Sequence, residues 1–502
     1  MKKYMGNKSK IVNRIFEEAS KLDIKNKIIF DAFSGTTNVG QYFKQNGYKI
    51  ISNDINETSE LLGNVYLKLN KLPTFDNLFN TDCKVINQIY KIERNGDFEK
   101  LKEEFIKENH NTNNEQYLKS IENENAFKLL VYLSFCATEK DIDDPHYKYI
   151  PDVRNFIWRN FCYDGTNADY FNLVARKSII SQIDILEKDF TNLFSILDVI
   201  KLLKESYEPP YKISNISEAI NLLEKNKDNS IKLQRVINKL KKISEKKNNV
   251  GKRLFFSDEH GHKIDTINIL NLIWLRNGLI SNDEYNYIQC SLVESVTLFS
   301  NTSATYQAFY KTLRENTLQR FRLIAPEIIS SKRNHLIYHK DTFELINTIK
   351  EKYEILYLDP PYNWRIYDSN YHLLNLISNY NQLADTIAEF EKDIAGAAGE
   401  NRKLVRNYTN YNRRGTFEDL LFRLIDSSSA KYVILSYSDS LSNHNKNSLS
   451  SVEKIEKYFS DTTKFNVANY KKIEISSRNF ESRKDQKKDK IHELLFIAEK
   501  LK

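Results

Sequence analysis

The sequence predicts an α/β fold: a Rossmann-like, mostly parallel sheet with a terminal antiparallel hairpin, interrupted by a large and mostly helical insert. Three observations lead to this fold class. Short β-branched runs alternate with helical segments at both ends of the chain, a pattern typical of parallel sheets. The apolar runs at 469–476 and 492–500 have the lengths expected of a final hairpin. Between the two flanks, residues 61–330 have mostly helical patterns.

The N-terminal flank contains one strand–helix–strand unit. A helix is predicted over 7–20, where apolar residues recur at helical intervals. Two short β-branched runs, 27–30 and 48–52, predict strands, and the segment 38–46 between them predicts a helix. Gly47 follows that helix as a good C-cap residue. This order is the beginning of a parallel α/β sheet.

The C-terminal flank resumes the same alternation. Strands are predicted at 335–339, 354–358 and 431–438. Helices are predicted at 342–353 and 417–428, between successive strands. The two flanks are therefore expected to complete one sheet, although a long segment of the chain separates them.

Domain boundaries follow from this alternation. Residues 1–60 and 331–502 are expected to form one α/β domain, and 61–330 a helical domain, because a segment of that length is too long for an unstructured loop. Within the insert, 178–207 reads as one long amphipathic helical stretch. The run 238–253 is strongly basic, and a solvated helix face followed by a loop is its simplest explanation.

Composition predicts a soluble cytoplasmic protein with no membrane partner. No apolar run reaches the roughly 18 residues that a membrane span needs, and the basic N-terminus leads into no apolar signal core. The four cysteines, Cys83, Cys136, Cys162 and Cys290, are scattered without metal-ligand spacing. Reduced thiols and no metal site are therefore expected.

The net charge of +8 and the pI near 8.8 suit a polyanionic partner such as a nucleic acid. The chain is also rich in Lys, Asn, Ile and Tyr throughout, a bias that genome base composition can produce as well. Charge alone therefore does not identify the partner.

Four acidic residues follow predicted strands: Asp31, Asp54, Asp341 and Asp359. Parallel sheets bind ligands beyond the carboxyl ends of their strands, so these acids predict a binding site. Gly35, in the loop DAFSGTTNVG after the first strand, permits a tight turn and a close backbone approach to a ligand. The loop is neither GxGxxG nor a P-loop, which disfavours a nucleotide triphosphate. Asp54 stands where dinucleotide-type folds hold ribose hydroxyls.

The stretch Asp359-Pro360-Pro361-Tyr362 directly follows the apolar run 354–358. Two prolines fix φ and stiffen the backbone. The Asp359 carboxylate and the Pro360 carbonyl are then two acceptors at one site, and an exocyclic amino group with two N–H donors is their complement. Tyr362 offers a flat face on which a base can stack, worth roughly 1–3 kcal/mol.

Several short motifs follow one another along the two flanks and at the end of the insert. They are KYMGNKSKI (3–11), DAFSGTTNVG (31–40), NDI (53–55), SNTSATYQAFYKTL (300–313), HKDTFELI (339–346), LDPPYN (358–363), SNYHLL (369–374), YVILSYSD (432–439) and HELLFIAE (492–499). Together they resemble the motifs of Dam-like adenine-specific DNA methyltransferases of the alpha class, in a restriction-modification-type branch. In that class the cofactor motifs come first, the target-recognition domain follows, and Asp-Pro-Pro-Tyr comes last.

The resemblance implies that the two flanks form an S-adenosylmethionine-dependent methyltransferase domain. Lys8 would lie near the methionine carboxylate with Tyr4 beside it, Asp54 would hold the ribose, and Asp341 with Phe343 would contact the adenine of the cofactor. Tyr4 stands where the family often has tryptophan, and GTTNVG is richer in hydroxyls than the common form, but neither departure removes a needed group. The implied cofactor-binding residues are Tyr4, Lys8, Asp31, Phe33, Gly35, Thr36, Asp54, Asp341, Phe343 and Asp359, and the implied catalytic residues are Asp359, Pro360, Pro361 and Tyr362.

The implied activity is site-specific methylation of DNA. A methyl group would pass from S-adenosylmethionine to the N6 amino group of an adenine flipped out of double-stranded DNA. Hydrogen bonds from N6 to Asp359 and to the Pro360 carbonyl would free the lone pair of the nitrogen. The insert would be the target-recognition domain. No acid-plus-lysine cluster stands out in the insert, so any restriction endonuclease partner would be a separate chain.

Other interpretations stay open at this point. The amino group could be cytosine N4, related Pro-Pro-Tyr enzymes act on RNA or on protein glutamine, and a catalytically silent DNA-binding protein could keep the fold. The basic stretch 477–490 is either a solvated loop or a phosphate contact. Trp364, Tyr367 and Tyr371, beyond the prolines, line the base pocket, close over DNA or pack against the insert.

Overall fold

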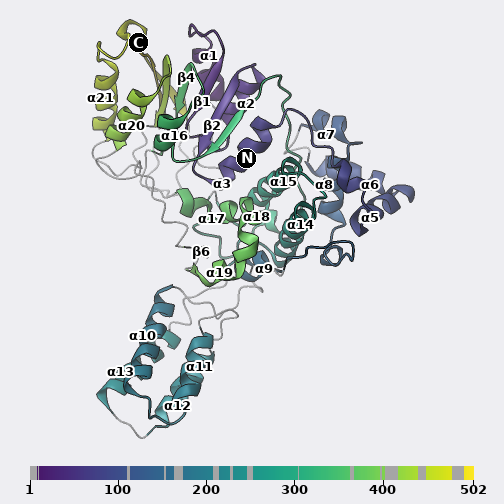
Figure 1. Cartoon of the computed structure of the whole chain (residues 1–502), viewed down its shortest axis with the longest axis vertical. Coiled ribbons are helices and arrows are strands. Elements are labelled where there is room, and N and C mark those ends of the chain that lie inside the picture. Colours follow the sequence, from purple (N-terminus) through teal and green to yellow (C-terminus); the bar gives the residue numbers. More distant parts are fainter. Residues whose placement is uncertain are drawn as a thin grey trace.

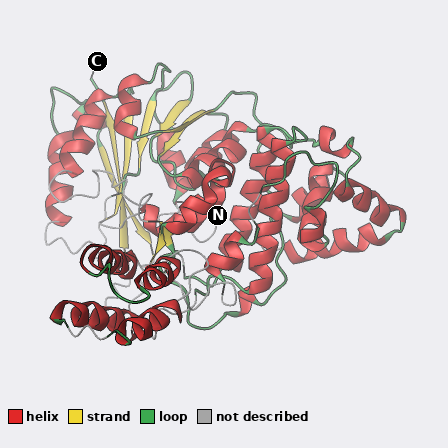
Figure 2. Ribbon diagram, turned by 60° about the horizontal axis from the view of Figure 1, so that its bottom comes forward, coloured by secondary structure: helices red, strands yellow, loops and turns green. Residues whose placement is uncertain are grey.

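A seven-stranded sheet forms the centre of the structure, with the strand order β3-β2-β1-β4-β7-β9-β8 (Figures 1 and 2). The strands are β1 (Ile28–Asp31), β2 (Lys49–Asp54), β3 (Leu336–His339), β4 (Ile355–Leu358), β7 (Tyr432–Ser438), β8 (Lys471–Ser477) and β9 (Ile491–Glu499). The structure is a computed structural model that describes residues 8, 11–109, 114–151, 154–162, 173–206, 214–226, 230–245, 253–303, 305–361, 367–395, 398–401, 417–438, 448–477 and 491–501.

The sheet is parallel except for one strand. Strands β3, β2, β1, β4 and β7 run parallel to one another, whereas β9 is antiparallel to both β7 and β8. The β8–β9 pair is the terminal hairpin that the runs 469–476 and 492–500 predict. The predicted fold class is therefore confirmed.

Helices cover both faces of this sheet, so its central strands are buried on both sides, whereas the edge strands β3 and β8 are partly exposed. On one face lie α1 (Val12–Ala19) and α2 (Asn38–Gln45). On the other lie α16 (Thr342–Thr348), α20 (Phe417–Ser427) and α21 (Ser448–Phe459). The helix predicted over 342–353 ends early, because Ile349 is extended and leads the chain back toward β4.

Most other helices share one large hydrophobic core, and we call this unit the helical body. Its long helices α14 and α15 pack against each other beside the sheet domain (Figure 1). Its helices are α3 (Glu57–Leu62), the π-helical η2 (Gly63–Lys68), α4 (Asp76–Phe79), α5 (Lys84–Arg94), α6 (Asp97–Asn109), α7 (Glu115–Ile121), α8 (Asn125–Phe135), α9 (Phe156–Phe161), α14 (Asp258–Arg276), α15 (Asn282–Phe299), α17 (Tyr367–Ser378), α18 (Tyr380–Leu383) and α19 (Ile387–Lys392).

The helical body includes a segment that follows β4 in sequence. Helix α17 packs against α3 and α15, and Tyr371 is buried in the shared core. A two-stranded ribbon of β5 (Ile394–Ala395) and β6 (Glu400–Asn401) follows α19. Tyr371 therefore packs within the helical body, as one of the alternatives from the sequence predicts. Trp364 lies outside the described residues.

Four helices of the insert form a separate unit, which we call the arm. They are α10 (Leu173–Asp189), α11 (Ile196–Ser206), α12 (Ser214–Glu224) and α13 (Ile231–Glu245), and they enclose their own core (Figure 1). The stretch 178–207, predicted as one helical run, is broken after α10. There the chain turns through Ser195, whose φ is 57°, so that α11 folds back against α10.

None of the described helices is both long and apolar enough to cross a membrane. All four cysteines are free thiols.

Candidate active site

The loop after β1 lies over the carboxyl edge of the sheet. Gly35 and Thr37 have positive φ values of 48° and 59°, so the backbone turns sharply between β1 and α2. Gly35 suits this conformation because it has no Cβ. The amide of Ser34 donates to the carbonyl of Asn53 on β2 at 3.0 Å. The predicted loop residues 33–36 therefore lie between the ends of β1 and β2.

Asp54, at the end of β2, is held in place by that loop. Its carboxylate accepts hydrogen bonds from the backbone amides of Gly35 at 2.8 Å and Asn56 at 3.0 Å. The side-chain amide of Asn56 donates to it at 3.1 Å. Burial raises the pKa of Asp54, and these hydrogen bonds oppose the rise. The carboxylate is thus fixed in orientation, with lone pairs left for the hydroxyl groups of a ligand.

Asp341 serves as the N-cap of α16. Its Oδ1 accepts hydrogen bonds from the amides of Phe343 at 2.8 Å and Glu344 at 3.2 Å. The hydroxyl of the neighbouring Thr342 donates to the carbonyl of Ala32 at 2.8 Å. These contacts fix the start of α16 against the end of β1, and they place Phe343 at the same edge of the sheet.

Asn53, which the sequence did not single out, connects the end of β2 to the loop after β3. Its amide nitrogen donates to the hydroxyl of Thr342 at 3.1 Å and to the carbonyl of Lys340 at 3.0 Å. Its amide oxygen accepts from the backbone amide of Lys340 at 3.1 Å. Asn53 belongs to the motif NDI, but its partners are separated from it by the whole insert, so only the fold reveals the contact.

Asp359, directly after β4, belongs to a cluster of charged groups. The Nζ atom of Lys8 is 3.1 Å from Asp359 Oδ1 and also contacts Oε1 of Glu493. The hydroxyl of Ser436 on β7 donates to Glu493 Oε1 at 2.8 Å. Burial raises the pKa of Asp359 to about 6; the ammonium of Lys8 opposes this rise, and the carboxylate of Glu493 adds to it. Lys8 therefore meets the end of β4 and side chains from β7 and β9 at one point.

Two buried polar atoms beside this cluster have no hydrogen-bond partner among the described residues: Oδ1 of Asp31 and the hydroxyl of Tyr357. Asp31 and Tyr357 are opposite each other on β1 and β4. Strand alternation places Asp359 on the same face as Tyr357, above the core that contains Ile29. Burial and the carboxylates of Asp359 and Asp54 raise the pKa of Asp31 well above its ordinary value. A positively charged or hydrogen-bond-donating ligand would satisfy these atoms.

The structure brings most of the predicted site residues to this carboxyl edge. Pro360 is buried and Pro361 half-buried, directly after Asp359. Tyr4 and Tyr362 lie outside the described residues. The predicted residues found at the edge are Lys8, Asp31, Phe33, Gly35, Thr36, Asp54, Asp341, Phe343, Asp359, Pro360 and Pro361. Sequence reasoning did not single out Glu493 or Ser436, although Glu493 belongs to the motif HELLFIAE.

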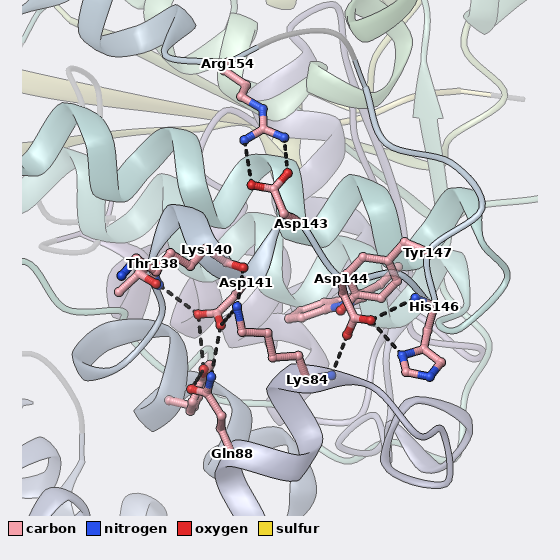
Figure 3. A network of polar contacts seen from close by, with 12 residues as sticks. Lys84, Gln88, Thr138, Lys140, Asp141, Asp143, Asp144, His146, Tyr147 and Arg154 are labelled. Atoms are coloured by element: carbon pink, nitrogen blue, oxygen red, sulfur yellow. Dashed lines mark hydrogen bonds and ion pairs between the residues drawn. The ribbon is translucent and has the colours of Figure 1, made fainter.

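A second polar network lies in the helical body (Figure 3). Asp141 accepts hydrogen bonds from the amide of Thr138 at 2.9 Å and from other side chains nearby. Asp144 accepts from the amide of Lys84 and from both the amide and the ring Nδ1 of His146, at 2.9 and 2.8 Å. Burial raises the pKa of Asp144, but these hydrogen bonds outweigh it and hold the pKa below its ordinary value. These acids fasten a loop to α5 through hydrogen bonds made within the protein.

Comparisons with known proteins identify the family of the chain. A family model described as "D12 class N6 adenine-specific DNA methyltransferase" matches residues 4–141 and 213–472. The chain is 30% identical over 250 residues to "Type II methyltransferase M.NlaIII" of Neisseria lactamica, covering 49% of this chain and 68% of that protein.

Two further relatives are longer proteins. The chain is 32% identical over 194 residues to "Modification methylase LlaI" of Lactococcus lactis subsp. lactis, covering 37% of this chain and 28% of that protein. It is 28% identical over 248 residues to "Type II methyltransferase M.FokI" of Planomicrobium okeanokoites, covering 49% of this chain and 35% of that protein. The chain thus spans about a third of the length of each. No solved structure gives a significant match.

Proposed function

The chain belongs to the D12 class N6 adenine-specific DNA methyltransferases, and on that premise we propose that it methylates N6 of an adenine flipped out of double-stranded DNA, with S-adenosylmethionine as the donor. The observation that carries this proposal is the meeting of Asp31, Asp54 and Asp359 at the carboxyl edge of the parallel strands, the edge at which such sheets bind ligands. Asp359 is followed by Pro360, whose carbonyl is the second acceptor that an amino group requires.

S-adenosylmethionine fits the chemistry of the groups at this edge. When bound, it supplies an electrophilic methyl group on a positively charged sulfur. Asp54, already oriented by two backbone amides, would accept the hydroxyls of the ribose. The unpartnered Oδ1 of Asp31 would face the positively charged methionine end. The remaining residues that we propose to line the cofactor are Tyr4, Phe33, Gly35, Thr36, Asp341 and Phe343.

Two of these proposed roles are narrowed by contacts within the protein. Lys8 contacts the carboxylates of Asp359 and Glu493, so we assign it to holding Asp359 in addition to any contact with the methionine carboxylate. Oδ1 of Asp341 is engaged by the cap of α16, so its contribution is to place Phe343 beside the cofactor.

The acceptor pair would activate the amino group of the target base. Hydrogen bonds from N6 to the Asp359 carboxylate and the Pro360 carbonyl favour a tetrahedral nitrogen, whose lone pair is then free to attack in line. That lone pair would form the bond to the methyl group, and the sulfur of the donor would keep the electrons of the bond that is broken. One N6 proton leaves to Asp359 and then to solvent. Tyr362 would stack on the base and offset part of the few kcal/mol that flipping costs.

The substitution Asp359→Ala tests this function. We expect methyl transfer to DNA to fall by at least about 10³-fold, because the acceptor and its charge are both lost. The affinity for DNA at fixed salt should stay within a few-fold of wild type. Turnover near normal would refute the role of Asp359. Expression in cells that lack adenine methylation, followed by modification-sensitive sequencing, would give the recognition site, and N4-methylcytosine there would refute adenine as the substrate.

The helical residues 61–330 are proposed as the target-recognition domain, and 1–60 with 331–502 as the catalytic domain. The helical body also draws on α17 to α19, so the part that reads DNA would be physically coupled to the segment after Asp359. A row of basic side chains on the arm supports the proposal that the arm contacts DNA. The side chains of Arg235, Lys239 and Lys242 are exposed at i, i+4 and i+7 on α13, on one side of that helix.

Neutralising this basic row tests whether it binds DNA. Two other lysines of α13 pair with acids of α10 and α12, whereas no ion pair is found for the row itself within the described part of the chain. The triple variant Arg235→Gln, Lys239→Gln, Lys242→Gln should reduce the steepness of log affinity against log salt by about 0.9 for each phosphate that the protein no longer neutralises. The matched control replaces three exposed lysines elsewhere on the arm, Lys188, Lys201 and Lys225, by glutamine. An unchanged slope in the first variant would make the row a solvated face.

We propose that the enzyme works in the cytoplasm as the modification partner of a restriction endonuclease on a separate chain. The names of the relatives, Type II methyltransferases and modification methylases, support such a role. The basic stretch 477–490 is also proposed to contact phosphates. Its residues 478–490 lie outside the described part of the chain.

A further inference from the structure

Glu493 lies at the active-site edge of β9 and has no role in the transfer described above. Because β9 is antiparallel to β7, its first residues lie where the parallel strands end. The next residues on the same face, Leu495 and Ile497, are buried in the core under α1 and α2. An apolar side chain at position 493 would continue that core without the desolvation cost of a carboxylate, and Glu493 is only 9% exposed. A glutamate here therefore needs a chemical reason.

The contacts of Glu493 lead to Asp359 through a single lysine. Its Oε1 contacts Lys8 Nζ, and the same Nζ atom lies 3.1 Å from Asp359 Oδ1. The hydroxyl of Ser436 fixes Oε1 from the other side at 2.8 Å. Two buried carboxylates, held by two different strands, thus share one ammonium group.

This sharing changes what Asp359 can do. A carboxylate held alone by a buried ammonium forms a tight one-to-one ion pair, and the lone pairs of the oxygen in contact are then directed at the cation. An amino group that needs the same lone pairs would have to compete with that cation. A second carboxylate draws the ammonium partly away and leaves Asp359 a stronger acceptor.

We propose that Glu493 is a positioning residue for methyl transfer: by sharing the ammonium of Lys8, it keeps the carboxylate of Asp359 open to the amino group of the target base. The inference rests on the proposed function of Asp359 as the acceptor for that amino group. The other titratable groups that interact electrostatically with Asp359 are Asp31 on β1 and Tyr357 on β4, and the ammonium of Lys8 also interacts with Tyr357.

The substitution Glu493→Gln separates charge from shape. Glutamine keeps the size of the side chain and an oxygen that can accept from Lys8 and Ser436, but it removes the negative charge. Asp359 then attracts the ammonium of Lys8 without competition from the charge of Glu493, so we expect kcat at its pH plateau to fall by about 10-fold. The like charge that raises the pKa of Asp359 is also gone, so the acid limb of kcat/KM should move to lower pH by about one unit.

Three further variants make the result specific. Glu474→Gln, at an exposed position on the neighbouring β8, is the matched control and should change neither kcat nor the acid limb. Ser436→Ala keeps the charge of Glu493 and should leave the acid limb in place. Glu493→Asp restores the charge, so the acid limb should return to the wild-type pH even if kcat remains lower.

The pH profile distinguishes this role from a purely structural one. A variant that is only less stable loses activity at every pH without moving the acid limb. An acid limb that stays in place or moves to higher pH in Glu493→Gln, or a kcat equal to wild type, would overturn the proposal. These outcomes are read against an active wild-type enzyme. Failure of the proposed function would instead show as absent adenine methylation by the wild type or full activity of Asp359→Ala.

Discussion

The carboxyl edge of the sheet and the loop network of the helical body both bury carboxylates, but they treat them in opposite ways. In the helical body, Asp141 and Asp144 accept hydrogen bonds from backbone amides and side chains on both sides (Figure 3). At the sheet edge, Oδ1 of Asp31 has no partner among the described residues, and the pKa of Asp31 and that of Asp359 are raised, chiefly by burial.

We interpret this difference as separating carboxylates that stabilise the fold from carboxylates that we propose to bind a ligand. A buried carboxylate with all its hydrogen bonds made is stabilised by the fold itself. A buried carboxylate with an oxygen that accepts no hydrogen bond destabilises the fold unless a ligand supplies a donor or a positive charge. Such groups concentrate at functional sites. Substitutions in the two regions should therefore have opposite effects on stability and on activity.

Of the substitutions that test this comparison, the largest effect on activity is expected from Asp31→Asn. Asparagine keeps the size of the side chain but removes the negative charge proposed to face the methionine end of the cofactor, so methyl transfer should fall at least about 100-fold. The free energy of unfolding at pH 7 should stay the same or rise, because a buried and incompletely paired carboxylate is removed. Methyl transfer and urea unfolding measure the two quantities. The control Asp23→Asn changes an exposed acid. If Asp31→Asn lost stability but kept its activity, Asp31 would serve the fold and not the chemistry.

The opposite result is expected from Asp144→Asn. An amide cannot accept from the Lys84 amide and from His146 as a carboxylate does, so the free energy of unfolding should fall by about 3 kcal/mol. Turnover per folded molecule should be unchanged. The adjacent Asp143→Asn is the matched control, because Asp143 is exposed and pairs with Arg154 at the surface. It should change stability by less than about 0.5 kcal/mol. A lower kcat in folded Asp144→Asn would show that this network serves chemistry after all.

The strands and the acids that end them could be predicted from the sequence, because each depends on a short local pattern. The run 354–358 is apolar, ends at Asp359 and is followed by two prolines, so its position at a ligand-binding edge needs no long-range information. The loop with Gly35 and the acid Asp54 follow the same logic. The terminal hairpin was predictable for the same reason.

The contacts between distant segments could not be predicted in this way. Lys8 and Glu493 meet across 485 positions, and only the placement of β9 between β7 and β8 brings them together. Helix α17 packs in the helical body although it follows β4, since an amphipathic pattern states which face is buried but not against which neighbour. The break after α10 was missed because residues 190–195 continue the apolar pattern of the helices around them.

Asp265 in the helical body sharpens the comparison, because it combines features of both regions. Its two carboxylate oxygens accept from the amides of Ile157 at 2.8 Å and Trp158 at 2.9 Å, at the start of α9. Burial nevertheless raises its pKa to about 7, as at the sheet edge. If a lack of hydrogen-bond partners is what distinguishes functional carboxylates, Asp265 should affect the stability of the fold and not turnover, despite its raised pKa.

The predicted signature of Asp265 is a pH-dependent stability with no effect on turnover. Because the pKa is higher in the folded state, the folded protein holds the proton through a range in which the unfolded chain has released it. Stability is therefore greatest at low pH and is lost as the pH rises from about 4 to about 7. Between pH 5 and pH 7 this loss should be about 2 kcal/mol. Asp265→Asn removes the titrating group, so its stability relative to wild type should improve by that amount over the same range, in urea unfolding at pH 5, 6 and 7. A constant difference between the two proteins, or a lower kcat in the variant at pH 7, would show that a raised pKa is the better mark of function.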